Sequence, residues 1–185
     1  MSESKNLRTE TIVLAGGCFW CLEAVFVEVE GVLAVTSGYI AGHLENPSYE
    51  RICDGDTGHA EAVRIEFDPA VITCADLLDI FFVIHDPTTL NRQGNDVGTQ
   101  YRSAIFTRDA EQEETARRKI LELEHQGVFP DPIVTQVQAA PHFWPAEAYH
   151  HNYFARNPYQ SYCQYVVAPK VAKLRSKFAK RLKAT

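Results

Sequence analysis

The sequence predicts an α+β fold, with mixed strands and helices connected by several long loops. Residues 60–67 alternate apolar and polar side chains, as a strand with one buried face does. Residues 109–126 form the clearest surface helix, with glutamates four residues before arginines and a glycine at its end. Because the 185 residues are 45% hydrophobic and 23% charged, we expect one globular domain spanning residues 1–185.

The other elements follow in chain order, beginning with a short apolar strand over residues 12–15. After it the sequence predicts a helix over 22–29, strands over 32–40 and 60–67, a helix over 73–84, a strand over 99–107, the helix over 109–126 and a strand over 133–138. Thr73 and Asp76 have the spacing of a capping box. Two polar loops, 41–59 and 85–98, are long enough to suggest a function.

The C-terminal residues 170–185 carry seven basic side chains and no acidic ones. Apolar side chains recur there at helical spacing, namely Val171, Leu174, Phe178 and Leu182. We predict a helix or tail that docks through this stripe and exposes a basic face to solvent. An alternative is a binding module whose basic tail contacts nucleic acid or an acidic partner. The net charge of −6 argues against nucleic acid as the main partner.

The expected location follows from the apolar stretches and the cysteines. No apolar stretch is long enough to span a bilayer, and the first residues lack the pattern of a signal peptide. Five cysteines, an odd number, argue against a disulfide framework of the secreted type. We therefore expect a cytoplasmic monomer that contacts neither membranes nor nucleic acid.

Cys18 follows an apolar strand and two glycines and precedes a helical pattern, so it is predicted at a helix N-terminus. The partial positive charge and free N–H groups of a first turn lower a thiol pKa from its usual value of about 8.5. Phe19 and Trp20 come next and are placed to form an apolar wall for a substrate. The alternative is a buried structural cysteine beside core aromatics.

Glu61 occupies a strand position where an apolar side chain is expected. Alternation places it on the face of Val63, Ile65 and Phe67, so its carboxyl is predicted to point to the core. Burial raises the pKa of a carboxyl, which suits a general acid at neutral pH. The alternative is a frayed strand end at which Glu61 reaches solvent.

Cys18 and Cys21 have the Cys-x-x-Cys spacing of dithiol oxidoreductases, which is an alternative function for the chain. A structural zinc site would need a second close pair, which the other cysteines do not supply. Cys53 and Cys74 are interpreted as structural.

A metal site is also disfavoured over residues 141–157. Four side chains there invite a metal interpretation, namely His142, Glu147, His150 and His151. A single Glu-x-x-His without a second copy, and without His-Glu-x-x-His spacing, is a weak metal signal. We therefore favour histidines and tyrosines as hydrogen-bonding supports of the core and predict no metal.

Several motifs occur in order along most of the chain. They are Gly-Gly-Cys-Phe-Trp-Cys at 16–21, Gly-His-Ala-Glu at 58–61, Asn-Asp-Val-Gly-Thr-Gln-Tyr-Arg-Ser at 95–103 and Pro-Ala-Glu-x-Tyr-His at 145–150. Together they resemble the A-type peptide methionine sulfoxide reductases. The resemblance implies a two-layer α/β sandwich around a mixed sheet. It also implies reduction of the S epimer of methionine sulfoxide, free or in proteins, to methionine.

The resemblance assigns the chemistry to particular residues. Cys18 matches the nucleophile that attacks the sulfoxide sulfur and becomes a sulfenic acid. Phe19 and Trp20 match the aromatics around the methionine methyl group, and Glu61 matches the general acid that protonates the sulfoxide oxygen.

Three further matches complete the predicted site. Tyr49 and Tyr101 match the two phenols that hydrogen-bond the sulfoxide oxygen. Asp96 matches the acid that positions substrate and water.

A second thiol condenses with the sulfenic acid to a disulfide, which thioredoxin or another dithiol then reduces, with no bound cofactor. Cys163 matches the resolving position of many family members, and the polar loop over residues 157–163 could bring it to Cys18. Cys21 is nearer in sequence and is the alternative resolving thiol. We favour Cys163.

Overall fold

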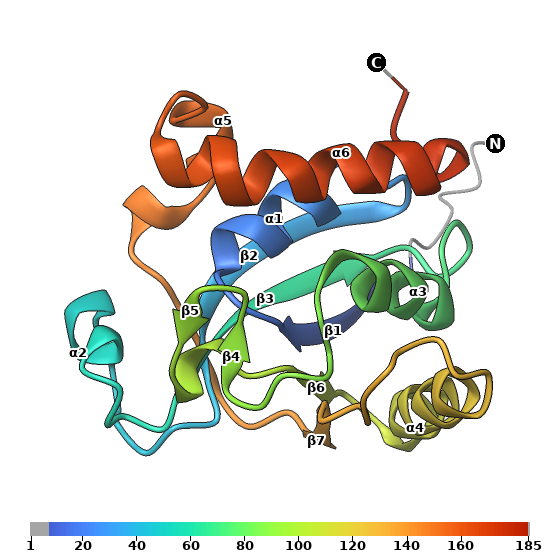
Figure 1. The fold of residues 1–185 in the computed structure, drawn as a ribbon, viewed down its shortest axis with the longest axis horizontal. Coiled ribbons are helices and arrows are strands. Elements are labelled where there is room, and N and C mark those ends of the chain that lie inside the picture. Colours follow the sequence, from blue (N-terminus) through green and yellow to red (C-terminus); the bar gives the residue numbers. More distant parts are fainter. Residues whose placement is uncertain (1–7, 185) are drawn as a thin grey trace, which may run out of the picture.

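The computed structural model describes residues 8–184, and a six-stranded mixed sheet forms its centre (Figure 1). The strand order is β7-β6-β1-β3-β2-β8, in which β6 and β7 are parallel and the other neighbours antiparallel. These strands are β1 (Glu10–Ala15), β2 (Val32–Ile40), β3 (Ala60–Phe67), β6 (Ala104–Thr107), β7 (Gln136–Ala139) and β8 (Phe143–Pro145). A small hairpin of β4 (Arg92–Gln93) and β5 (Asp96–Val97) stands apart. The predicted α+β class is confirmed.

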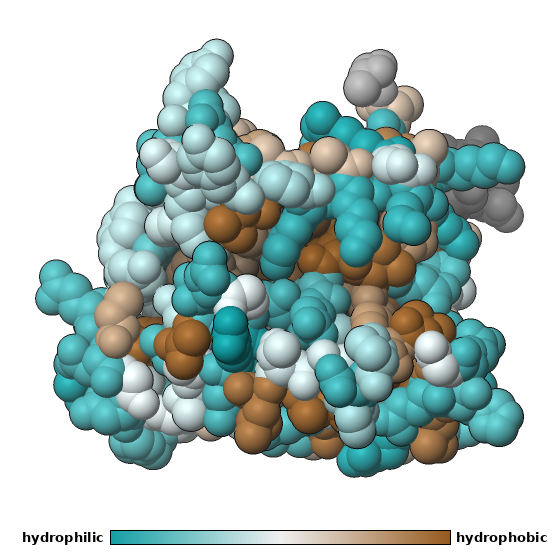
Figure 2. All heavy atoms as spheres, in the orientation of Figure 1, coloured by the Kyte–Doolittle hydropathy of each residue, from teal (hydrophilic) through white to brown (hydrophobic). Residues whose placement is uncertain are grey.

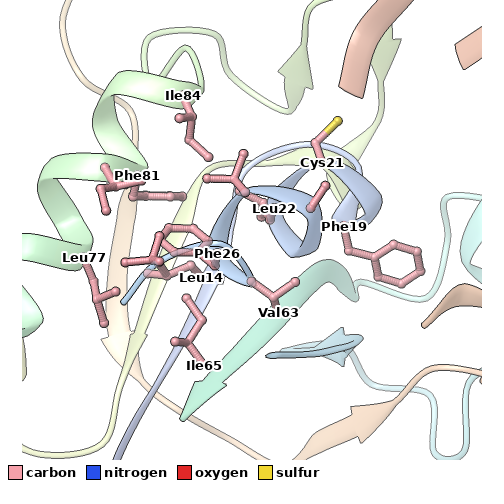
Figure 3. Packing of buried hydrophobic residues seen from close by; sticks show 14 of the residues in the cluster. Leu14, Phe19, Cys21, Leu22, Phe26, Val63, Ile65, Leu77, Phe81 and Ile84 are labelled. Carbon is pink, nitrogen blue, oxygen red and sulfur yellow. The ribbon is translucent and has the colours of Figure 1, made fainter. Parts of the chain in front are cut away.

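Helices pack against one face of the sheet and enclose the main core. They are α1 (Phe19–Phe26), α3 (Cys74–Ile84), α4 (Ala110–His125) and α6 (Ala168–Lys177). Figure 3 shows Leu14, Val63 and Ile65 of the sheet meeting Phe26 of α1 and Phe81 of α3. The main core therefore holds α1 rigidly across β1 and β3, the two strands that bring Cys18 and Glu61 together.

The helix caps form as the sequence predicts. At the start of α3, the Thr73 hydroxyl accepts from the Asp76 amide and the Asp76 carboxylate accepts from the Thr73 amide, both over 3.1 Å. At the start of α4, the Asp109 carboxylate accepts from the Gln112 amide over 2.9 Å. Such caps satisfy N–H groups that a first helical turn leaves without partners.

The C-terminal segment docks through apolar side chains, as predicted. Val171 and Leu174 are buried in the main core, and α6 packs along α1. The helix begins two residues before the predicted start and ends at Lys177, after which η4 (Ala179–Arg181) forms a short turn. Arg175 pairs with Glu28 at the end of α1, with the Arg175 Nε 2.9 Å from the Glu28 Oε2.

Two strand predictions need correction. The predicted strand over 99–107 is a strand only from Ala104, because residues 99–101 form the 3₁₀ turn η1 (Thr99–Tyr101). The Arg102 guanidinium stabilises this turn by donating to the carbonyls of Thr99 over 2.9 Å and Gly58 over 3.0 Å. The strand predicted over 133–138 starts at Gln136, where pairing with β6 begins.

Short elements form outside the predicted helices and strands. The predicted loop over 41–59 holds α2 (Tyr49–Cys53), capped by Ser48. The segment over 141–157, for which no element was predicted, holds β8, η2 (Ala148–His150) and α5 (Tyr153–Arg156). The loop over 157–163 is shorter than predicted, because helical structure starts at Ser161 and Cys163 opens the π-helix η3 (Cys163–Val167). Over residues 8–184, no helix combines the length and apolar character needed to span a membrane.

Candidate active site

Cys18 lies at the junction of β1 and α1, in the N-cap position of the helix. Gly17 precedes it with a φ of 90°, a conformation that favours glycine, and a Cβ at Gly17 would lie 2.7 Å from the Cγ of Gln93. The side chain of Cys18 is nearly buried, and its sulfur accepts a hydrogen bond from the Trp20 amide. The predicted position of Cys18 at a helix N-terminus is confirmed.

The predicted lowering of the Cys18 pKa is wrong. Burial raises the pKa of Cys18 well above its usual value, and a hydrogen bond to Cys21 and the charge of Glu61 raise it further. The helix terminus lowers the Cys18 pKa only through the hydrogen bond from the Trp20 amide. Desolvation of the buried thiolate outweighs this one hydrogen bond. In this pair the Cys18 thiol donates to the Cys21 sulfur, and the same hydrogen bond lowers the pKa of Cys21.

Glu61 is the second residue of β3 and points into the core, as strand alternation predicts. Only 1% of its surface is exposed. Its Oε1 accepts a hydrogen bond from the backbone amide of Phe19 over 3.2 Å. Burial raises the pKa of Glu61 to about 8. The hydrogen bond from Phe19 lowers this pKa, and the charges of Asp96 and Cys21 raise it. The carboxyl is therefore protonated at neutral pH and available as an acid.

Tyr49 and Tyr101 approach Glu61 from two different loops. Tyr49 is the first residue of α2, and its amide donates to the Oε2 of Glu147 over 3.1 Å. Tyr101 ends η1. Burial, and then the charge of Glu61, raise the pKa of both phenols. Both hydroxyls therefore remain protonated donors beside the acid.

Asp96, on β5, meets a residue that the sequence did not single out. The Tyr162 hydroxyl donates to the Oδ2 of Asp96 over 2.6 Å and also forms a hydrogen bond with Cys21. Burial raises the pKa of Tyr162. The hairpin that carries Asp96 is thereby linked to α1 and to the segment before Cys163.

The aromatic wall of the site is built around Trp20. Its indole stacks on Tyr153, with ring centroids 3.7 Å apart, and its Nε1 donates to the Nδ1 of His150 over 3.1 Å. Phe19 is fully buried and packs on Tyr39 and His150, so only Trp20 of the predicted pair is partly exposed. The prediction that a histidine of this segment is a hydrogen-bonding support is confirmed for His150. Glu147 accepts from the Tyr39 hydroxyl and the Tyr49 amide.

The remaining cysteines differ in their relation to the site. Cys163 is buried, and its charge interaction is with Cys21. Cys53 is exposed and forms a hydrogen bond with the Tyr49 hydroxyl, so it borders the site. Cys74 lies at the start of α3, and burial raises its pKa to about 12. In the described part of the chain, no group of three or more His, Cys, Asp or Glu could hold a metal ion.

Comparison with known proteins identifies the family. The family model described as "Peptide methionine sulfoxide reductase" matches residues 10–182. The chain belongs to this family. The chain is 59% identical to a peptide methionine sulfoxide reductase MsrA of Polynucleobacter asymbioticus, over 94% of this chain and 92% of that protein. It is 55% identical to the protein of the same name in Deinococcus radiodurans, over 94% of this chain and 84% of that protein.

Solved structures agree with this assignment. Reduced Mxr1 of Saccharomyces cerevisiae superposes with a TM-score of 0.80 at 34% identity, covering 88% of this chain and 95% of that one. Methionine sulfoxide reductase A of Corynebacterium diphtheriae superposes with a TM-score of 0.74 at 34% identity, covering 86% of this chain and 80% of that one. The chain is therefore a methionine sulfoxide reductase of the A type, an oxidoreductase, and the two-layer α/β fold implied by the resemblance is confirmed.

Sequence reasoning missed two side chains of this reductase site, namely Tyr153 and Tyr162. Tyr153 stacks on Trp20, 133 positions away, and Tyr162 donates to Asp96, 66 positions away. The one local signal was the concentration of aromatic and histidine residues over 149–165.

Proposed function

We propose that the protein reduces the S epimer of methionine sulfoxide, free or within proteins, with Cys18 as nucleophile and Glu61 as acid. The observation that carries the proposal is the buried, protonated Glu61, which accepts from the amide next to Cys18 and lies within charge-interaction range of that thiol. A nucleophile and an acid held side by side are what reduction of a sulfoxide requires.

The chemical step transfers one oxygen atom. Cys18 reacts as its thiolate: its sulfur attacks the sulfoxide sulfur and forms a sulfur–sulfur bond, while Glu61 donates a proton to the sulfoxide oxygen and the sulfur–oxygen bond breaks. The oxygen then bonds to the Cys18 sulfur as the sulfur–sulfur bond breaks, which releases methionine and leaves Cys18 as a sulfenic acid. Tyr49 and Tyr101 donate hydrogen bonds to the oxygen as its negative charge grows.

Substrate binding is assigned to the aromatic wall and to Asp96. The partly exposed face of Trp20 contacts the methyl group, while Phe19 supports the wall from within the core. Asp96 positions substrate and water together with Tyr162.

Two thiols compete to resolve the sulfenic acid, which condenses with a thiol to a disulfide and water. Cys163 is the choice that the family resemblance favours. The interaction between the Cys18 and Cys21 thiols supports Cys21 as the first partner, because a disulfide between them needs no loop to move. The burial of Cys163 at the start of η3 supports the same order.

Peptide mapping by mass spectrometry after one turnover on methionine sulfoxide, without reductant, tests this route. We expect a Cys18–Cys21 disulfide in the wild type and in Cys163→Ser. A wild-type disulfide between Cys18 and Cys163 would contradict Cys21 as the first partner while leaving the reductase function intact.

Thioredoxin is the proposed reductant, and no bound cofactor is required. A structure titled Mxr1 from Saccharomyces cerevisiae in complex with Trx2 shares this fold, with a TM-score of 0.57 at 22% identity over 83% of this chain and 90% of that one. All five cysteines are free thiols. Free thiols support a reducing compartment, so we propose a cytoplasmic protein, and a monomer.

The alternative function is that of a general dithiol oxidoreductase, which the interaction between Cys18 and Cys21 supports. Glu61→Gln separates the two functions. Disulfide exchange with a model disulfide should persist in this variant if the alternative holds, whereas sulfoxide reduction depends on the acid.

A further inference from the structure

A groove of about 480 Å³ runs beside the N-terminal half of α6. Its apolar lining comes from three segments and includes Ile84, Phe129 and Pro169. Lys170 and Lys173 border it on the α6 side, and Asp86 and Asp131 lie on other walls. Figure 2 shows hydrophobic surface exposed beneath the hydrophilic row along α6. An apolar floor with a charged rim is the usual anatomy of a protein docking surface.

One side chain connects the groove to the turn that carries Cys18. Gln93 lines the groove, and a Cβ at Gly17, the residue before Cys18, would lie 2.7 Å from the Gln93 Cγ. The charge of Lys170, also in the groove, lowers the pKa of Cys21. Figure 3 shows the Cys21 sulfur pointing away from the Phe19 ring. The π-helix η3, which begins at Cys163, continues into α6 just before Lys170.

The two lysines of the groove are free to pair with a partner. Arg175 and Arg181 of the same segment form ion pairs with Glu28 and Asp76. Between residues 8 and 184, neither Lys170 nor Lys173 has a carboxylate oxygen within 4.0 Å. A partner with carboxylates around its contact loop would complement these charges.

Substrate-facing residues lie elsewhere. Trp20, Tyr49 and Tyr101 do not line the groove. A protein seated in the groove would therefore leave the substrate side of Cys18 open.

We propose that this groove is the docking surface of the protein dithiol that reduces the enzyme, through Lys170, Lys173 and the apolar floor. The partner presents an apolar loop beside its reactive thiol and carboxylates at the rim. This inference rests on the proposed function, because docking serves to reduce the disulfide formed on Cys18.

The exchange is a two-electron reduction. The partner's thiolate attacks one sulfur of the enzyme disulfide and forms a mixed disulfide between the two proteins. The partner's second thiol then attacks the partner's own sulfur in that mixed disulfide. Both enzyme thiols are released, and the partner leaves as a disulfide. Cys18, Cys21 and Cys163 are all buried in the reduced chain, so the sulfur under attack must become exposed before the exchange. Cys163 lies in the π-helix η3. π-helical turns are frequent at such functional positions.

The test compares Lys173→Glu with Lys177→Glu, a matched charge reversal one turn further along α6 and outside the groove. For each variant, methionine sulfoxide turnover is measured with thioredoxin and with dithiothreitol, which needs no docking surface. We expect the KM for thioredoxin of Lys173→Glu to rise about five- to tenfold at low ionic strength, less at high salt, and that of Lys177→Glu to change less than about twofold.

Equal KM values for the wild type and Lys173→Glu would overturn the docking surface, as would an equal rise in Lys177→Glu. Phe129→Ser tests the apolar floor independently, with the same expected rise in KM for thioredoxin. Dithiothreitol-driven turnover separates this inference from the proposed function. If the wild type reduces methionine sulfoxide with dithiothreitol while Lys173→Glu has the wild-type KM for thioredoxin, the docking surface is overturned and the proposed function stands.

Discussion

The Phe19 backbone amide donates a hydrogen bond to the Oε1 of Glu61 over 3.2 Å, which ties the residue after Cys18 to the buried acid of β3. The hydrogen bond fixes the carboxyl beside the thiol before any substrate arrives. Burial raises the pKa of this carboxyl to about 8, so it is protonated at neutral pH.

Glu61→Gln should therefore lower sulfoxide reduction at pH 7 by about 10²- to 10⁴-fold, the usual contribution of a general acid. The advantage of the wild type over the variant should shrink as pH rises through about 8, where Glu61 loses its proton, because the thiols are present in both proteins. Steady-state rates between pH 6 and 10 measure both effects. Glu66→Gln, on the same strand but the opposite face, is the matched control, and a comparable loss there would contradict the role of Glu61.

The same substitution should stabilise the fold at alkaline pH. The pKa of Glu61 is about 8 in the folded protein against a usual 4.5, so between these values only the folded state holds the proton. The free energy of unfolding therefore falls as pH rises from about 4.5 to 8 and levels off above. At pH 9 the free energy of unfolding of Glu61→Gln should exceed that of the wild type by on the order of 5 kcal/mol. Urea unfolding at pH 6 and 9 tests this, and an identical pH dependence in both proteins would refute it.

His150→Phe should disturb the substrate wall without touching the thiols. The variant keeps the ring but removes the acceptor of the Trp20 Nε1, which leaves a buried donor unpaired at a cost of about 1–3 kcal/mol. We expect the KM for methionine sulfoxide to rise about three- to tenfold with a smaller change in kcat. His142→Phe is the control, because His142 packs on Trp144 away from the site. An unchanged KM in His150→Phe would show that the wall does not depend on this hydrogen bond.

Leu174→Ala tests whether the basic C-terminal helix is a structural part of the domain. Leu174 is fully buried against α1, so its truncation should lower the free energy of unfolding by about 2–5 kcal/mol. Leu121→Ala on α4, where the side chain is 66% exposed, should change it by less than about 0.5 kcal/mol. Denaturant titrations give both values. Equal stability of the two variants would mean that α6 is dispensable for folding.

The sequence was sufficient where the deciding interaction is local. Strand alternation predicted that Glu61 faces the core, and the Thr73–Asp76 spacing predicted the cap of α3, because each depends on neighbours a few residues away. The position of Cys18 at a helix start follows from the glycines before it.

Tertiary contacts decided what the sequence could not. The pKa of Cys18 depends on burial and on Glu61, which lies 43 residues further along the chain, so helix-end reasoning gave the wrong sign. Tyr162 reaches Asp96 across 66 residues, and no local pattern encodes that hydrogen bond. Cys163 was placed in a mobile loop because its segment is polar, whereas packing against α1 buries it in η3.

Turnover of the separate S and R epimers of methionine sulfoxide with dithiothreitol is the decisive test of the proposed reaction. We expect the wild type to reduce the S epimer and not the R epimer, and Cys18→Ser to reduce neither. Reduction of the R epimer alone, or S-epimer turnover that survives in Cys18→Ser, would contradict it.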